Sequence, residues 1–367
     1  MATLKQQLAT RTRPAAPELI ERLPNGRIQC HACGHRCRIR PGGDGICRVR
    51  FHRDGELRVP FGYVGALQID PIEKKPFFHA FPGHTALSFG MLGCDFHCSY
   101  CQNWVTSQTL RDENATVRPR DIGAAELVAL AQQNGAPVVV STYNEPLITS
   151  EWAVEIFACA RAAGLTCGFV SNGNATEEAL SYLRPHTDLY KVDLKGFDDR
   201  RYRSLGGVLA HVLETIERTK AMDFWVEVVT LLIPGFNDSD DEMRGMARFI
   251  AGVSTDIPWH VTAFHPDYKM TDRGGTPAAT LLRAYEHGRA AGLHFVYPGN
   301  LPGNVGDTES TFCPGCETRL IHRRGFTVLE NRLRDGACPD CARVIPGHWG
   351  DRPLERSNHS GLPQPLA

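Results

Sequence analysis

The sequence predicts an α/β fold: a partial (β/α) barrel with small cysteine-rich modules at its N-terminal and C-terminal ends. Three observations predict it. Short apolar runs alternate with amphipathic stretches between residues 84 and 300, polar turns follow successive runs, and most of the 13 cysteines fall into three groups with ligand-like spacing. The chain has 367 residues, which suits one large domain with appendages or two medium ones.

The alternation covers the middle of the chain. The runs predicted as strands are 86–92, 137–142, 165–171, 188–194, 224–233, 259–264 and 293–297. The stretches predicted as helices are 124–134, 151–164, 175–183, 209–222, 239–252 and 277–292. Repeated strand–helix alternation is typical of a parallel sheet, and roughly 215 residues suit a barrel or partial barrel. The alternative is an open doubly wound sheet, which no GxGxxG motif supports here.

Composition excludes several classes of protein. Hydrophobic residues make up 42% and charged residues 22%, and 40 basic against 41 acidic residues leave a net charge of −1, so charge indicates neither a nucleic-acid nor a membrane binder. The sequence contains no run of about 18 apolar residues, so it predicts no transmembrane helix. The N-terminus lacks the apolar core of a secretory signal. We therefore expect a cytoplasmic protein with no membrane contact, in which grouped cysteines indicate metal binding or catalysis.

Composition shifts along the chain predict five segments. Residues 1–25 are polar and predict a tail or loose helix, and 26–65 form a Gly-rich, cysteine-rich N-terminal module. Residues 84–300 form the α/β core. Residues 302–350 contain two CxxC pairs and predict a zinc-ribbon-like module separate from the active site. Residues 351–367 are rich in Pro, Ser and Gly and predict a disordered tail.

Polar residues follow six of the predicted strands. They are Cys94, 143–146, 171–173, 193–196, 234–238 and 265–267. In barrels the carboxyl ends of the strands line one face, where the active site lies. Each turn alone is unremarkable, but together they predict one site.

Cys94, Cys98 and Cys101 form a CxxxCxxC group on the loop after the first strand of the core. Three thiolates can hold three irons of a [4Fe–4S] cluster and leave the fourth iron open to a ligand. A closed electron-transfer cluster would need a fourth cysteine, and none is nearby in the sequence. The alternatives are a zinc site or three unrelated thiols.

These residues carry a resemblance. The motif GCDFHCSYCQNW, with TYNEP, SNG, KVDLKG, LLIPGFND and FHPDYKM after it, resembles radical S-adenosylmethionine (SAM) enzymes of the branch that contains pyruvate formate-lyase-activating enzymes. The run 28–350 is similar to the radical SAM component of the AmmeMemoRadiSam system. The resemblance implies a barrel of the radical SAM type and reductive cleavage of SAM at the cluster. It further implies a 5′-deoxyadenosyl radical that abstracts hydrogen, and an electron donor such as flavodoxin or ferredoxin.

The resemblance also implies cofactor contacts. Glu145 stands where the family usually has Gly-Gly-Glu-Pro, a turn that contacts the methionine ammonium, and Asn144 replaces one of its glycines. Tyr100 stands where the family places an aromatic ring near adenine. Asn172, Asp193 and Lys195 are expected at the ribose or carboxylate. The alternatives are a helix-capping turn for Glu145, core packing for Tyr100, and satisfied buried polar groups for the others.

Two further types of residue lie in or near the core strands. His265 ends the sixth strand and is a candidate hydrogen-bond donor to cofactor or substrate, although a satisfied core histidine is the alternative. Cys159 and Cys167 stand apart from the groups and are expected to be small buried hydrophobes.

Two more cysteine groups flank the core. The C-terminal pairs predict a tetrahedral zinc site and comprise Cys313, Cys316, Cys338 and Cys341. The N-terminal group, which holds either zinc or an auxiliary iron–sulfur cluster, comprises Cys30, Cys33, Cys37 and Cys47. Arginines accompany the C-terminal pairs, Arg323 among them, and form either a solvated face or a contact for RNA or an acidic protein.

Three functions follow from these patterns. The first is an activase that abstracts hydrogen from a glycine of a partner protein. The second is modification of RNA or a small molecule, which the extra cysteine modules favour. The third is a non-catalytic scaffold stapled by metals, against which the open three-cysteine loop argues. Contact with other AmmeMemoRadiSam components is a further expectation from the resemblance.

Overall fold

The structure is a computed structural model that describes residues 3–351 and 353–366. Among these residues, nine strands form one sheet in the order β16-β15-β14-β13-β12-β11-β9-β8-β20. The strands from β9 to β16 in this sheet are parallel. They are β9 (Thr85–Gly90), β11 (Val138–Ser141), β12 (Thr166–Ser171), β13 (Leu189–Asp193), β14 (Trp225–Leu232), β15 (Trp259–Ala263) and β16 (Val296–Gly299).

Each predicted strand of the core exists, and the last one is displaced. The run 293–297 was expected as the strand, but β16 begins at Val296. Leu293 instead lies in the turn after the preceding helix, which ends at Ala290, and its N–H donates to the Gly288 carbonyl at 3.1 Å. Its apolar side chain is buried in the core without belonging to the sheet.

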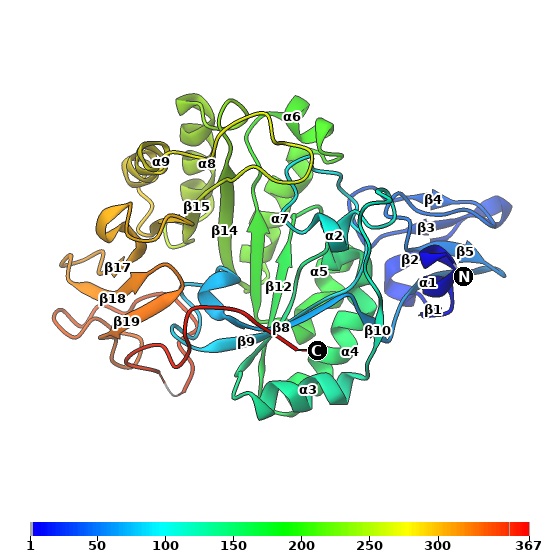
Figure 1. Cartoon of the computed structure of the whole chain (residues 1–367), viewed down its shortest axis with the longest axis horizontal. Coiled ribbons are helices and arrows are strands. Elements are labelled where there is room, and N and C mark those ends of the chain that lie inside the picture. The colour runs from blue at the N-terminus through cyan, green and yellow to red at the C-terminus, as the bar shows by residue number, and fades with distance from the viewer. Residues whose placement is uncertain (1–2, 352, 367) are drawn as a thin grey trace.

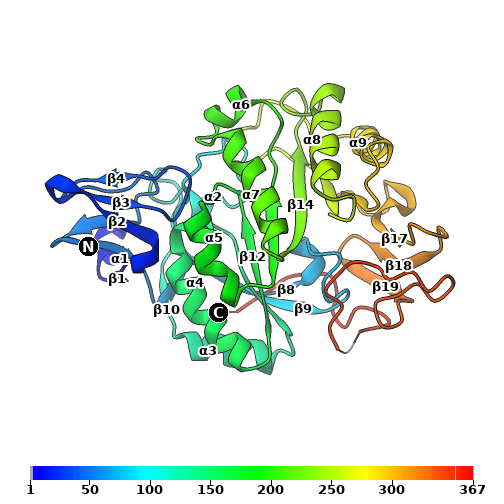
Figure 2. The ribbon, with the colours of Figure 1, turned by 180° about the vertical axis from the view of Figure 1, so that it is seen from behind.

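The helices connect successive strands and cover one face of the sheet, as Figure 2 shows. They are α3 (Ala124–Gln133), α4 (Ser150–Ala162), α5 (Glu177–Leu183), α7 (Leu209–Ala221), α8 (Asp240–Val253) and α9 (Ala278–Ala290). Local caps fix several starts: Thr176 accepts from the Ala179 N–H, and Ser239 accepts from the Glu242 N–H. Two short helices were not predicted, α2 (Trp104–Ser107) and α6 (Asp199–Ser204). The predicted α/β class is confirmed.

The sheet does not close into a full barrel. Beyond β9 it continues with two antiparallel strands, β8 (Ala66–Pro71) and β20 (Gln364–Pro365), so β16 and β20 are its edges. Residues 351–367 were expected to be disordered, and the structure describes 351 and 353–366 of them. In the structure they run back along the molecule, where the Asn331 N–H donates to the Glu355 carbonyl at 2.7 Å and the Leu366 N–H donates to the Leu67 carbonyl at 3.1 Å. Backbone pairing places this segment, and its composition carries no signal of that.

The N-terminal module consists of short antiparallel sheets. Its elements are α1 (Leu4–Ala9), β1 (Thr12–Pro14), β2 (Ile20–Arg22), β3 (Ile28–Cys30), β4 (Arg38–Ile39), β5 (Phe51–Arg53) and β6 (Glu56–Pro60). Residues 1–25 were expected as a tail or a loose helix; the described part, 3–25, contains α1, belongs to this module and buries Leu8 and Leu19. A further pair, β7 (Tyr63–Val64) and β10 (Arg120–Asp121), connects the module to the core.

The C-terminal module is a three-stranded antiparallel sheet at the other end of the molecule (Figure 1). Its strands are β17 (Thr311–Phe312), β18 (Arg319–Arg324) and β19 (Thr327–Asn331). A small hydrophobic cluster joins this sheet to Phe78, Phe295 and Tyr297 of the core. The two cysteine-rich modules therefore lie on opposite sides of the parallel sheet.

Candidate active site

A cavity of about 380 Å³ lies on the inner face of the parallel sheet. Alternate residues of four adjacent strands line it, and alternation places them on one face of the sheet. These residues are Lys191 and Asp193 of β13, Val229 and Leu231 of β14, His260 and Thr262 of β15, and Tyr297 and Gly299 of β16. The helices cover the opposite face, so the cavity occupies the space that a barrel encloses.

Five of the residues predicted for the site line this one cavity. Cys98, Tyr100 and Cys101 come from the loop after β9, and Asp193 and Lys195 come from the end of β13. The carboxyl ends of two strands that are far apart in the sequence therefore meet here, as the polar turns predict.

The cysteine loop is held by its surroundings rather than by regular structure. Gly93 adopts a positive φ of 95°, and a Cβ there would come within 2.9 Å of Val49 of the N-terminal module. Arg111 donates to the Cys94 carbonyl at 2.7 Å. The Cys101 Sγ lies 3.1 Å from the Ser107 hydroxyl oxygen. Burial raises the pKa of Cys98 to about 12, so this thiol becomes a thiolate only with a cationic partner such as a metal.

A chain of charges lines the cavity beside the cysteines. Asp193 contacts the ammonium groups of Lys191 and Lys195, the latter at 3.1 Å. Burial alone would raise the pKa of Asp193, but the two lysines lower it to about 2. Asp193 is therefore a fixed carboxylate, and Lys195 is held where it can meet an anionic group of a ligand.

Glu145 and Asn172 lie behind the cavity wall instead of lining it. The Glu145 carboxylate accepts from the Leu147 N–H at 3.1 Å, the Ser171 hydroxyl at 2.8 Å and the Asn172 N–H at 2.6 Å. Burial, with a smaller effect of Asp95, raises the pKa of Glu145 to about 8. This geometry matches the capping alternative for Glu145, and its contact with a cofactor stays a prediction.

Asp95, inside the cysteine motif, was not singled out from the sequence. It is fully buried and accepts from the side-chain amides of Asn172 at 2.7 Å and Asn174 at 2.8 Å. The Asn172 amide is thus directed at the cysteine loop and not at the cavity. The Ser-Asn-Gly-Asn turn after β12 positions the cysteine loop through Asp95. The two asparagines of this turn are the sequence feature from which that contact could have been predicted.

A second group of charged residues was also missed. Lys75 lies 2.6 Å from Asp70 and 3.1 Å from the Tyr143 hydroxyl, and the Tyr143 hydroxyl also bonds to Asp70. Burial lowers the pKa of Lys75 to about 8. Tyr143 has a φ of 68°, which is uncommon for a bulky residue and indicates local strain. Lys75 and Tyr143 both line the cavity.

Tyr100 and His265 are placed very differently. Tyr100 is buried against Phe236, and its hydroxyl has no hydrogen-bond partner among the described residues. A buried orphan hydroxyl at a cavity is expected to bond to a ligand. His265 is exposed, with its Nδ1 3.0 Å from the Gln102 amide nitrogen. It lies at the outer rim beside the cysteine loop, so it is not the satisfied core histidine of the alternative.

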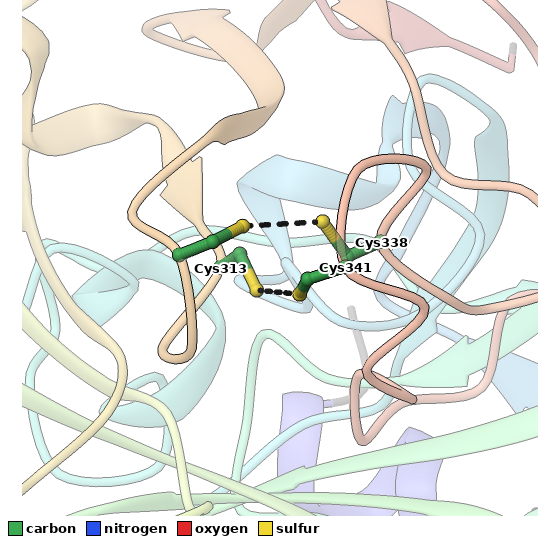
Figure 3. A group of neighbouring side chains, drawn as sticks. Cys313, Cys338 and Cys341 are labelled. Carbon is green, nitrogen blue, oxygen red and sulfur yellow. Dashed lines mark hydrogen bonds between the residues drawn. The ribbon is translucent and has the colours of Figure 1, made fainter.

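The four C-terminal cysteines converge, as Figure 3 shows for three labelled members of the set. The Sγ atoms of Cys313 and Cys341 are 3.5 Å apart and those of Cys316 and Cys338 are 3.6 Å apart. All four Sγ atoms lie within 4.8 Å of one another. Tetrahedral zinc with Zn–S bonds of about 2.3 Å separates its thiolates by about 3.8 Å. The set can therefore bind a single metal ion.

The N-terminal cysteines form a looser group. The Cys30 N–H donates to the Cys37 carbonyl at 2.9 Å, and Cys33 and Cys47 are buried nearby. In the part of the chain that the structure describes, no second set of three or more His, Cys, Asp or Glu ligand atoms gathers within 4.8 Å. Metal binding by these four cysteines stays a prediction. Of the two isolated cysteines, both expected to be buried, Cys167 is fully buried and Cys159 is only partly buried.

Comparison with known proteins identifies the family. Residues 90–250 match the model of the Radical SAM superfamily. An uncharacterized protein of Methanocaldococcus jannaschii is 37% identical over 329 residues, which cover 89% of this chain and 97% of that protein. The chain belongs to the radical SAM superfamily. The pyruvate formate-lyase-activating enzyme of Staphylococcus aureus is a more distant relative, 26% identical over 183 residues that cover 47% of this chain and 72% of that enzyme.

Solved structures show weaker likeness. SuiB of Streptococcus suis matches with a TM-score of 0.45 at 14% identity, over 62% of this chain and 52% of that one. A domain of a pyruvate-formate lyase-activating enzyme from Bacteroides vulgatus matches with a TM-score of 0.38 at 18% identity, over 44% and 98%. In the described residues of this radical SAM protein, every helix is too short or too polar to cross a bilayer.

The cavity fits the cofactors that the radical SAM superfamily implies, a [4Fe–4S] cluster and SAM. Cys94, Cys98 and Cys101 lie on one loop, the last two line the cavity, and sulfur is the donor type that iron–sulfur clusters use. Tyr100, whose buried hydroxyl has no partner among the described residues, and Lys195 line the space next to them. The first offers a hydrogen bond and the second a positive charge to a polar, anionic ligand.

Proposed function

We propose that this protein is a radical SAM enzyme that removes a hydrogen atom from its substrate, in the manner of the activating enzymes. Cys94, Cys98 and Cys101 would hold a [4Fe–4S] cluster, which with bound SAM supplies one-electron chemistry that produces a carbon radical. The chain's own residues have three tasks: to fix the cysteine loop, to orient SAM, and to keep bulk water from the cavity.

One observation carries the proposal. Cys98 and Cys101 of the cysteine loop line the same cavity as Asp193 and Lys195, so sulfur atoms and polar groups that could orient SAM face one space. Lys195 is suited to the carboxylate of SAM, because its ammonium is held by Asp193 at 3.1 Å. A scaffold that binds metals only for stability would not need a cavity at its cysteine loop.

The test is anaerobic reconstitution of the full chain with iron and sulfide, followed by reduction and an assay for 5′-deoxyadenosine formed from SAM. Wild-type protein should form it. Replacing Cys94, Cys98 and Cys101 together by Ala should abolish both product and the SAM-responsive EPR signal of the reduced cluster. Cys159→Ala, at a partly buried helix position, is the matched control and should change neither. Product from the triple variant would refute the assignment.

Two classes of substrate fit this chemistry, and the cavity favours one of them. A glycine of a partner protein, the activase substrate, carries no charge. The cavity is lined by Lys74, Lys75, Lys191 and Lys195 and also by the carboxylates of Asp193, Glu73 and Glu309. The lysine ammonium groups can bind an anionic group, which supports a small anionic substrate as the second candidate.

Fractionation of a cell extract separates the two candidates. SAM cleavage by the reconstituted enzyme should be stimulated by the small-molecule filtrate, and passage over an anion exchanger should remove the stimulation. Lys191→Met should reduce this stimulation relative to wild type. Stimulation by the macromolecular fraction alone, in particular by a protein that acquires a glycyl radical, would favour the activase instead.

We propose in addition that the chain is the radical SAM component of an AmmeMemoRadiSam system and works in the cytoplasm with a flavodoxin or ferredoxin as electron donor. The motifs between residues 28 and 350 and the two flanking modules support this assignment. Co-purification of the tagged full chain with the other components of that system, from cells that encode them, is the test. Recovery of the chain alone under conditions that preserve its cluster would count against a stable complex.

A further inference from the structure

The turn between β18 and β19 of the C-terminal module reaches the catalytic cavity. Gly325 and Phe326, at this turn, line the same space as Cys98 and Cys101. Glu309 lines it as well and accepts from the Gly325 N–H at 3.2 Å, which holds the turn in place. The sequence predicted a module separate from the active site, and the structure places part of it in the cavity wall.

The open edge of the sheet explains why such a wall is needed. β16 pairs with β15 on one side, and β8 and β20 extend the opposite edge, so within residues 3–351 and 353–366 no further strand of the sheet encloses the cavity beside β16. The segment that follows β8 and the β18–β19 hairpin occupy this side. In Figure 1 the orange hairpin lies beside β9 and the segment that precedes it.

Arg323 of β18 joins the hairpin to that segment. It is buried, donates to the Phe78 carbonyl at 2.6 Å and to the Thr311 hydroxyl at 2.7 Å, and its guanidinium lies 4.4 Å from the centre of the Phe78 ring. Its Nε lies 3.6 Å from a carboxylate oxygen of Glu73. Phe78 and Glu73 both line the cavity. The expectation of a solvated arginine face is therefore wrong for Arg323.

The metal-binding cysteines belong to the same packed unit. Cys313 and Cys338 lie in one hydrophobic cluster with Leu320, Ile321 and Phe78. The module has little other core, so its order depends on the cross-link that a bound ion would supply. Contacts run without interruption from the four cysteines through β18 to the cavity.

We propose that the C-terminal metal site holds a wall of the catalytic cavity in place, and that Phe326 at the hairpin tip limits the size of what enters. The ion has a structural role, since it cross-links the module that forms this wall, and it takes no part in the chemistry. Arg323 is a positioning residue in this arrangement. The inference rests on the proposed function only in identifying the cavity as catalytic; the closing of the cavity by the hairpin is tested without cluster or SAM.

Thiol labelling provides that test. The full chain, loaded with its C-terminal metal but not with the cluster, is treated with iodoacetamide, and each cysteine is followed by mass spectrometry. Cys98 should react slowly, since it is 7% exposed. Cys338→Ser should raise the labelling rates of Cys98 and Cys101 about tenfold or more, because opening of the wall becomes favourable. Cys167, fully buried in β12, should stay unlabelled and report an intact core.

Two variants separate the wall from the metal. Arg323→Met should raise labelling of Cys98 with the metal still bound, whereas Arg319→Met, at a partly exposed arginine of the same strand, should not. Phe326→Ala should raise the reaction of Cys98 with a bulky maleimide more than with iodoacetamide. Leu329→Ala, 44% exposed on β19, is its control.

The outcomes are decisive in each direction. Unchanged labelling of Cys98 in both Cys338→Ser and Arg323→Met overturns the proposal. If Cys338→Ser also exposes Cys167, the core has opened, and the other two variants decide the question. An unchanged labelling rate of Cys98 in both Arg323→Met and Phe326→Ala then overturns the proposal. A higher rate in either of them, with Cys167 still protected, supports it. Failure of the wild-type protein to form 5′-deoxyadenosine is a separate result. It would refute the proposed function but would not bear on the proposal that the hairpin closes the cavity.

Discussion

The two cysteine-rich modules have the same number of grouped cysteines but different relations to the cavity. The C-terminal four bring their Sγ atoms within 4.8 Å of one another, and their hairpin lines the cavity. The N-terminal module instead contacts the back of the cysteine loop, where Val49 packs on Gly93 and Arg111 links the Ile46 and Cys94 carbonyls. One module closes the space for the ligand, and the other positions the loop that would hold the cluster.

The modules also differ in how they are fixed to the core. Arg50 of the N-terminal module makes a bidentate pair with Glu151 of α4, both bonds 2.7 Å, and both side chains are fully buried. At the C-terminal module the corresponding pair, Arg323 and Glu73, is 3.6 Å apart, and the second oxygen of Glu73 has no partner within the described residues. The Arg50–Glu151 pair is therefore the tighter of these two ion pairs.

The largest expected effect concerns the C-terminal metal. Structural zinc contributes about 10–16 kcal/mol of binding free energy in small zinc modules, so Cys338→Ser should release one zinc and make residues 302–350 sensitive to protease. Cys47→Ser, the matched change in the N-terminal group, should leave that zinc in place. Metal analysis and limited proteolysis check both. Iron in place of zinc at the C-terminal site, or a protected segment in Cys338→Ser, would contradict the structural-zinc assignment.

The second effect compares the two arginines. Arg50→Met leaves the Glu151 carboxylate buried without its partner, which should lower the free energy of unfolding by about 3–5 kcal/mol. Arg323→Met should lower the free energy of unfolding by less, about 1–3 kcal/mol, because it removes hydrogen bonds next to a glutamate that can take up a proton. Urea unfolding of both variants gives the difference. Arg203→Met, at an exposed pair with Asp199, is the control and should change little. An equal or larger loss for Arg323→Met would reverse the ranking of the two attachments.

Most of the fold was predictable because hydrophobic periodicity and caps are local signals. The strands at 86–92 and 188–194 and the helix at 239–252 were found from such patterns, and β9, β13 and α8 lie there. What the sequence did not reveal depends on contacts between distant segments. Arg323 could not be distinguished from its exposed neighbours because its burial depends on Phe78, some 245 positions away. β20 is defined only by its pairing with β8.

The candidate site shows the same difference between what local sequence patterns predict and what depends on contacts between distant segments. Cys98, Cys101, Asp193 and Lys195 were expected together because they follow parallel strands, and they line one cavity. Lys75 was missed, because it reaches the cavity from the segment after β8, where no strand–turn rule applies. Glu145 was assigned from resemblance alone, and its oxygens are engaged by three donors of its own chain.

The third effect is a pH dependence at the C-terminal attachment. Burial raises the pKa of Glu73 from 4.5 to about 7. Below pH 4.5 the carboxyl is protonated in both the folded and unfolded states. Between pH 4.5 and 7 the unfolded chain loses the proton while the folded one keeps it, so stability falls by roughly 3 kcal/mol as the pH rises through this window. Glu73→Gln should flatten that decrease in urea unfolding, whereas Glu330→Gln, exposed on β19, should not. Parallel curves for wild type and Glu73→Gln would show that Glu73 does not titrate in this range.

The smallest effect tests the N-terminal side of the comparison. Arg111 donates to the Ile46 carbonyl of the N-terminal module and to the Cys94 carbonyl of the cysteine loop, both at 2.7 Å. Two hydrogen bonds of this kind contribute about 1–3 kcal/mol together. Arg111→Met should therefore leave the global unfolding midpoint nearly unchanged but loosen the loop, so that Cys94 in the cluster-free chain reacts several-fold faster with iodoacetamide. Arg218→Met, which removes an exposed pair with Glu214 on α7, is the matched control. If the N-terminal module positions the loop, iron uptake by Arg111→Met should also slow while zinc at the C-terminal site stays constant. A loop whose Cys94 labels at the wild-type rate in Arg111→Met would mean that packing of Val49 on Gly93 alone positions it, and the two modules would then differ less than their contacts indicate.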